Sequence, residues 1–182
     1  LPAMSLKPGS FLLVFASDKN RTLPPLSFQT IIDKGEVWKY LVPAANQGDA
    51  WKNNGFNDSG WNTGPSGFGY GDNDDSTILT NIMSVYIRKE FFISNLDDIS
   101  QLVLSIDYDD GFAAYINGHE IARKNLGTPG TAISYNQAAT SREALMFSGG
   151  FPENYLVTVP GSILIEGLNV IAIEGHNTVT GS

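Results

Sequence analysis

Hydrophobic and polar residues alternate along the chain in short runs that are typical of β-strands. From Leu102 to Tyr108 an apolar residue occupies every second position, which is the period of a half-buried strand. Similar runs, separated by turn-forming residues, predict further strands at residues 37–42, 85–93, 112–116, 155–159 and 168–174. Residues 141–147 fit either one helical turn or a short strand. The pattern predicts an all-β protein, built as an antiparallel β-sandwich or jelly roll.

A β-hairpin is predicted around Asn117-Gly118, because both residues tolerate the positive φ that a two-residue type I′ turn requires. Such a turn also fixes the register of the two strands that it joins. We expect three cross-strand pairs: Ile116 with His119, Tyr115 with Glu120, and Ala114 with Ile121. His119 is then expected to be a packed or hydrogen-bonded side chain.

The stretch from Pro43 to Thr80 is polar and rich in Gly and Asn, and its large aromatic residues follow no clear period. A segment of that length without regular structure is either functional or held in place by its own aromatic side chains. We favour the second interpretation, because large aromatic residues chiefly provide core contacts. Two of the three Trp residues of the chain are expected in the core.

Composition agrees with a turn-rich β protein and excludes several functions. The 182 residues include 19 Gly, 9 Pro, 10 Phe, 7 Tyr and 3 Trp, and the net charge is −8. An acidic chain without a basic stripe does not suit a phosphate backbone, so no nucleic acid partner is expected. No apolar run approaches the roughly 20 residues of a membrane span. The absence of Cys excludes thiolate metal sites and cysteine nucleophiles.

Residues 1–30 differ from the rest of the chain. The run FLLVFA at residues 11–16 predicts a buried strand, and the two prolines within residues 22–27 indicate a linker. The segment KPGSFLLVFASDKNR, residues 7–21, resembles the closing part of a lamin-tail domain. We expect residues 1–30 to be the remnant of such a domain and residues 31–182 to form the main domain.

Four motifs of the main domain occur in a set order: GFNDSGW (55–61), VYIRKEFFI (85–93), DDGFAAYINGHEI (109–121) and EGLNVIAIEGHN (166–177). Together they resemble the galactose-binding-domain-like jelly roll found as the sugar-binding domain of family 2 glycoside hydrolases. That family continues with one more strand, so either the domain is truncated here or the N-terminal segment fills the edge. The resemblance implies an accessory module of a secreted or cell-surface, multidomain bacterial protein.

Two residues in these motifs have structural as well as functional interpretations. Asp58 is expected to accept backbone N–H groups in a turn, with a sugar contact as the alternative. Arg88 is expected to be a partly buried ion-pair partner rather than a ligand clamp.

Two acidic clusters are candidates for a structural Ca²⁺ site. We expect no other cofactor. Asp72, Asp74 and Asp75 lie on a Gly-bounded loop and supply the hard oxygen atoms that Ca²⁺ requires, without the spacing of an EF-hand. In the second cluster Asp107 and Asp109 share a face and repel each other unless a cation or an Arg lies between them. Asp109 and Asp110 also resemble part of a Ca²⁺-holding hairpin of PA14-type lectin modules.

For both clusters the alternative is turn chemistry. The first cluster would then be a solvated turn. In the second, Gly111 would supply the backbone freedom that the turn requires.

We expect no catalytic activity. A glycosidase needs two carboxylates that face each other across a cleft, and nothing in the sequence brings candidates such as Asp107 and Glu174 together. The two histidines, His119 and His176, lack metal-type spacing, and no nucleophile elbow, P-loop or dinucleotide fingerprint is present.

The leading hypothesis is a non-catalytic carbohydrate-binding module. A sugar site combines an aromatic platform with a few convergent polar groups. The predicted ligand contacts are Trp51, Tyr70, Arg123 and Tyr135, together with Asp72 and Asp74. The alternative is a structural spacer that packs against neighbouring domains of the same polypeptide, whose exposed aromatic residues should form an apolar patch. A glycoside hydrolase domain is a third, weaker hypothesis.

Overall fold

The computed structural model describes residues 29–70, 75–157 and 160–180. The chain divides into two units, residues 1–30 and residues 31–182, and every described strand belongs to the second. The predicted strand at residues 11–16, the linker at residues 22–27 and the lamin-tail resemblance lie outside the described residues. In the described part the elements are β-strands and 3₁₀ helices of three residues each, so the unit is all-β, as predicted. No helix there is long and apolar enough to cross a membrane.

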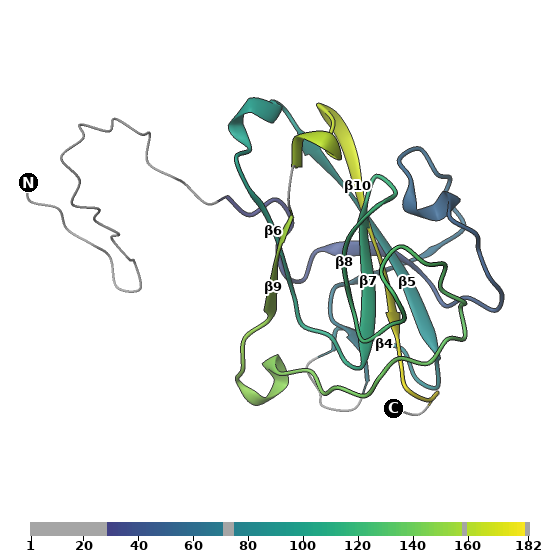
Figure 1. Cartoon of the computed structure of the whole chain (residues 1–182). Helices are drawn as coiled ribbons and strands as arrows, with labels where there is room; N and C mark the ends of the chain where they lie inside the picture. Colours follow the sequence, from purple (N-terminus) through teal and green to yellow (C-terminus); the bar gives the residue numbers. More distant parts are fainter. Residues whose placement is uncertain (1–28, 71–74, 158–159, 181–182) are drawn as a thin grey trace, which may run out of the picture. The chain divides into compact units, whose positions relative to one another are not determined.

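A six-stranded antiparallel sheet forms the centre of the unit (Figure 1). Its strands, in spatial order, are β2 (Asn62–Pro65), β1 (Val37–Leu41), β5 (Ser84–Ile93), β10 (Gly167–His176), β7 (Gly111–Ile116) and β8 (His119–Lys124). The central strands β5 and β10 have ten residues each and pair along their whole length. Every strand predicted in this sheet is present, with ends close to the expected ones.

The remaining described strands form two smaller sheets. The antiparallel pair β6 (Leu102–Ile106) and β9 (Glu153–Val157) forms one, and the short parallel pair β3 (Phe68–Gly69) and β4 (Thr77–Ile78) forms the other. The 3₁₀ helices are η1 (Ala50–Lys52), η2 (Leu96–Asp98), η3 (Met146–Ser148) and η4 (Pro160–Ser162). Residues 141–147 therefore form no strand and end in the helical turn η3.

Both faces of the six-stranded sheet are covered, which makes all six residues of β7 buried. One core lies between this sheet and the β6–β9 pair, so the fold is a β-sandwich. Its buried residues include Trp38, Phe91, Ile93, Tyr108, Phe112, Ile116 and Ile171. The second core lies on the opposite face, under loops rather than a sheet. Its buried residues are Trp51, Tyr86, Ala113, Tyr115, Leu126, Ala139 and Ala172.

The segment between Pro43 and Thr80 contains η1 and three short strands rather than one structureless loop, and aromatic side chains hold its η1 part in place, in agreement with the favoured interpretation. Trp51 stacks on Tyr86 of β5 with ring centroids 4.5 Å apart, and Trp61 lies 6.1 Å from Trp51. The loop is thereby attached to the second core. The expectation of two core Trp residues is confirmed, because Trp38 and Trp51 are buried.

The structure confirms the turn of the predicted hairpin, but one of the three predicted cross-strand pairs is wrong. Asn117 and Gly118 have φ values of 49° and 84°, and two of the three predicted pairs, those at residues 116 and 115, form. Ala114, however, pairs with Ala122 instead of Ile121, because a β-bulge inserts one extra residue into β8. The expectation for His119 is also wrong, since its side chain is exposed beside the turn.

Candidate functional site

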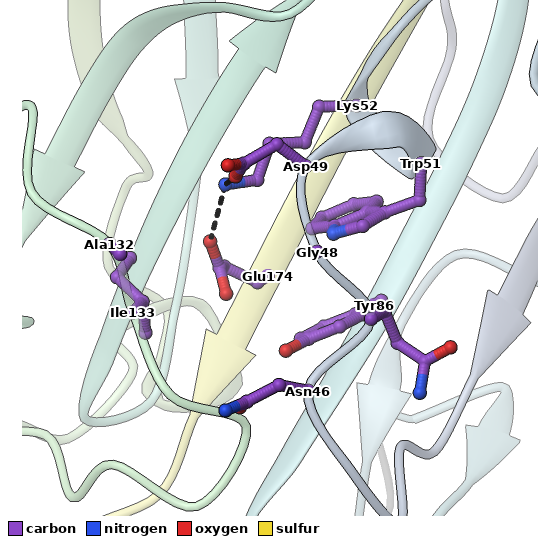
Figure 2. A pocket seen from close by; sticks show the side chains of 10 residues that line it. Asn46, Gly48, Asp49, Trp51, Lys52, Tyr86, Ala132, Ile133 and Glu174 are labelled. Atoms are coloured by element: carbon purple, nitrogen blue, oxygen red, sulfur yellow. Dashed lines mark hydrogen bonds and ion pairs between the residues drawn. The ribbon is translucent and has the colours of Figure 1, made fainter.

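A pocket of about 140 Å³ lies on the face of the six-stranded sheet that carries the second core. It is bounded by the loop that leads into η1 and by the loop at residues 132–133, with side chains of β5 and β10 at its base (Figure 2). Its lining residues are Asn46, Gln47, Gly48, Asp49, Trp51, Lys52, Tyr86, Ala132, Ile133 and Glu174. We call this the β10 pocket.

The floor of the β10 pocket is aromatic. The rings of Trp51 and Tyr86 are nearly parallel, at 7° to each other, and Tyr115 meets Trp51 edge-on with centroids 6.2 Å apart. Trp51 and Tyr86 are only 1% and 2% exposed, so neither ring offers an open face to solvent. This arrangement gives a rigid apolar base with polar groups around it.

Arg88 fixes η1 on the sheet and so fixes Trp51. Its Nε donates to Asp58 Oδ2 at 3.0 Å, and its Nη1 donates to the carbonyl oxygens of Trp51 and Asn53. Its guanidinium group also lies 5.1 Å from the Phe56 ring. The prediction that Arg88 is an ion-pair partner is therefore confirmed. The expected turn role of Asp58 is taken by Asn57, whose side chain accepts from the Ser59 N–H.

Three charged side chains meet at one side of the pocket. Lys52 Nζ lies 2.7 Å from Asp49 Oδ1 and 3.8 Å from Glu174 Oε1 (Figure 2). The same ammonium group lies 4.3 Å from the centre of the Tyr115 ring, at a distance suited to a cation–π contact. Lys52 is thus surrounded by two carboxylates and an aromatic face, which explains how a lysine can be buried here.

Glu174 is held by a network beneath the pocket. Its Oε1 accepts a hydrogen bond from the Tyr115 hydroxyl at 2.7 Å, and its Oε2 lies 3.3 Å from His176 Nε2. His176 Nδ1 lies 2.9 Å from the Gln137 carbonyl oxygen, which fixes the ring. Burial, followed by the charge of Glu174, raises the pKa of the Tyr86 and Tyr115 hydroxyls, so both remain hydrogen-bond donors at neutral pH.

The two rims of the pocket are tied to each other. Asn46 Oδ1 accepts from the Tyr135 N–H at 2.8 Å, which joins the first loop to the loop at residues 132–135. Arg123 holds the second loop from below. It pairs with Glu120 at 2.6 Å and donates to the carbonyl oxygens of Thr128 and Thr131.

Of the predicted ligand contacts that the structure describes, only Trp51 belongs to the pocket lining. Its side chain is buried rather than open to a ligand, because η1 packs it against Tyr86. The Arg123 side chain is 2% exposed and makes its contacts with the loop below the pocket rim. Tyr135 is half-buried against the second core, and Tyr70 is half-buried after β3, neither of them among the pocket-lining residues.

Of the candidate Ca²⁺ ligands, Asp75, Asp109 and Asp110 belong to the described residues. Asp72 and Asp74 lie outside the described residues, and Asp75 lies against Gly69. Asp110 is buried, and its carboxylate accepts from the backbone N–H groups of Arg142 and Thr178 at 3.1 and 2.6 Å. Within residues 29–70, 75–157 and 160–180, no group of three acidic or His side chains could hold a metal ion. Calcium binding, including by Asp109, stays a prediction.

The turn beside Asp110 differs from the expectation in one respect. Asp110 itself has the left-handed conformation, with φ of 57°, and Gly111 does not. Gly111 is needed for space instead, since a Cβ there would lie 2.8 Å from the Ala139 Cβ. The Arg expected near Asp107 is Arg142, whose Nη1 lies 3.8 Å from Asp107 Oδ1.

Sequence reasoning missed four polar groups of the pocket and named Glu174 only as a possible glycosidase carboxylate; the four are Asn46, Gln47, Asp49 and Lys52. A signal existed for Glu174 and His176. They continue the alternation of Val170 and Ala172 along β10, so they extend a buried face with polar side chains. No comparable signal existed for Asn46, Asp49 and Lys52, because their loop has no period.

No protein-family model and no curated protein matches the sequence. Solved structures do match the fold. A calcium binding mutant of Bacteroides uniformis beta-glucuronidase 2 aligns with a TM-score of 0.51 and 15% identity, over 79% of this chain. The beta-glucuronidase of an uncultured Clostridium sp. aligns with a TM-score of 0.51 and 18% identity, over 85% of this chain.

The chain spans only 14% and 24% of the lengths of these two enzymes. At such identities the likeness shows the fold alone. Residues 31–182 therefore have the fold of a domain-sized part of larger glycoside hydrolases, in line with the motif resemblance. The jelly-roll connectivity stays a prediction.

Proposed function

We propose that this chain is a non-catalytic accessory module that binds the terminal sugar residue of a glycan in the β10 pocket, as part of a secreted or cell-surface multidomain protein. The observation that carries the proposal is the pocket itself. It brings several polar side chains together over a buried aromatic base, and ligand sites typically combine an apolar lining with a few convergent polar groups. At about 140 Å³ it is smaller than the roughly 300 Å³ of pockets for drug-sized ligands, which suits one sugar ring.

The arrangement of carboxylates supports a binding role over a catalytic one. A glycosidase places its two carboxylates on opposite sides of the scissile bond. Here Asp49 and Glu174 both approach the same ammonium group, that of Lys52. Asp107, the other candidate, belongs to a separate cluster with Arg142.

A glycan-array screen followed by NMR titration of the hits tests the proposal. Ala132→Trp adds a large ring at an exposed position of the pocket lining, and we expect it to abolish glycan binding. Ala138→Trp is the matched control, because Ala138 is exposed in the same loop but does not line the pocket. Glycan binding that survives Ala132→Trp, or the absence of any glycan hit, would overturn the proposal.

A second function, packing against a neighbouring domain, is favoured by a separate surface. Val103 and Leu156 form a cross-strand pair on β6 and β9 and are 44% and 56% exposed. The loop that precedes β9 exposes Phe147 and Phe151, at 47% and 84%. Exposed apolar side chains that lie together, as Val103 and Leu156 do, are typical of interaction surfaces. Hydrogen exchange tests this: β6 and β9 amides should gain protection in the longer polypeptide relative to this chain alone.

A further inference from the structure

The charges around the β10 pocket restrict the sugars that it can accept, provided that the proposed sugar binding is correct. The lining contains two carboxylates, of Asp49 and Glu174, and one ammonium group, of Lys52. The remaining polar side chains, those of Asn46, Gln47 and Tyr86, are uncharged at neutral pH. The pocket therefore carries a net charge of about −1, from one positive and two negative groups.

The single cation of the lining is already engaged by protein groups. Lys52 Nζ contacts Asp49 at 2.7 Å, Glu174 at 3.8 Å and the face of Tyr115 at 4.3 Å. Arg123, another cation near this face, is also engaged, since it pairs with Glu120 at 2.6 Å.

The exposed group at the pocket mouth is an anion. The side chain of Asp49 is 79% exposed, whereas that of Lys52 is 11% exposed. A sugar entering the pocket thus meets a carboxylate before it meets the ammonium group. Sugar hydroxyls and ammonium groups can donate to this carboxylate, but a sugar carboxylate cannot.

We propose that the β10 pocket takes sugar residues without a carboxylate, that is neutral hexoses and amino sugars, and rejects uronic acids. Two enzymes that contain a domain of similar fold are named beta-glucuronidases. Because the pocket carries a net negative charge, we expect its ligand to differ from the glucuronic acid that such a name implies.

The test is an NMR titration with matched methyl glycosides at low salt and pH 7. Each of the gluco and galacto series supplies a neutral sugar, its 2-amino form and its uronate. We expect the uronate to bind about tenfold more weakly than the neutral sugar, because a carboxylate placed near Asp49 and Glu174 is repelled. The amino sugar should bind at least as tightly as the neutral one. Added salt should narrow the difference, since it screens exposed charges.

The Asp49→Asn variant distinguishes the effect of the Asp49 charge from the effect of the shape of the side chain. It removes the exposed anion and leaves Lys52 without its closest partner, so the preference for neutral sugar over uronate should fall to about twofold or less. Asp98→Asn is the control, because Asp98 is exposed on η2 outside the pocket and its loss changes the net charge equally. The preference should be unchanged there.

The outcomes distinguish this inference from the proposed function. A uronate that binds as tightly as the neutral sugar, or an Asp49→Asn variant with an unaltered preference, overturns the inference and leaves sugar binding intact. The absence of binding by every glycoside in both series overturns the proposed function, and the inference with it.

Discussion

Replacing Asp58 with Asn tests how the loop that carries Trp51 is held on the sheet. The Arg88 side chain is 1% exposed and that of Asp58 is 21% exposed, with Nε and Oδ2 3.0 Å apart. Burial lowers the pKa of the Arg88 guanidinium, and the charge of Asp58 acts in the opposite direction. Removing the carboxylate charge leaves a buried cation without its anionic partner.

The expected cost follows from this geometry. Removing one partner of a fully buried ion pair costs about 3–5 kcal/mol. Asp58 keeps some contact with water, and an Asn oxygen can still accept from Arg88 Nε, so we expect about 2–3 kcal/mol. For a unit of about 150 residues this corresponds to a fall in Tm of about 4–12 °C.

The assay is urea unfolding followed by tryptophan fluorescence, with Glu36→Gln as the matched control. Glu36 pairs with Lys89, the neighbour of Arg88 on β5, at 2.7 Å, but those side chains are 36% and 22% exposed. An exposed pair contributes at most about 1 kcal/mol, so the control should lose much less stability. If Asp58→Asn costs no more than Glu36→Gln, burial does not strengthen the Arg88–Asp58 pair and the expected cost is wrong.

Three further predictions concern packing and pH. Gly64→Ala should lower the free energy of unfolding by about 1–3 kcal/mol in urea titrations, because the added Cβ would overlap the buried Thr77 side chain. Phe112→Ala should cost about 3–5 kcal/mol in the same assay, since Phe112 is 1% exposed in the first core; a cost below about 1 kcal/mol would contradict that core. Hydrogen bonding from the Tyr155 hydroxyl lowers the pKa of Glu153 below its ordinary value of 4.5, so its contribution is present above that pH and lost as pH falls through the lowered value. In urea titrations the free energy of unfolding of wild type should therefore exceed that of Glu153→Gln at pH 7, by no more than about 1 kcal/mol given the exposure of Glu153, and the two should converge as pH falls through the lowered pKa.

The strands were predictable because their signals are local. Alternation of apolar residues and the Asn117-Gly118 turn depend on neighbours in sequence, and both appear in the structure at the expected positions. The bulge in β8 depends on what each face of the hairpin meets in the folded chain. The bulge therefore could not be predicted from the sequence, and the predicted pairing of Ala114 was wrong by one residue.

The candidate site was harder to predict than the fold. Trp51 was predicted as a ligand contact on a loop, but it is buried, and its environment is set by Tyr86 and Arg88, distant in sequence. The charged groups of the pocket meet only because η1 lies over β10. Residue type indicated sugar-binding chemistry, while the positions of the groups depend on contacts between distant segments.

The bulge connects the hairpin to the candidate site. Without the extra residue in β8, Arg123 would lie opposite Phe112, on the face of the first core, where a charged group would be costly to bury. With the bulge it lies opposite Ala113, on the face of the second core. From there its guanidinium group binds the carbonyl oxygen of Thr131, the residue that precedes Ala132 at the pocket rim. One inserted residue in an edge strand thus determines where the wall of the β10 pocket is anchored.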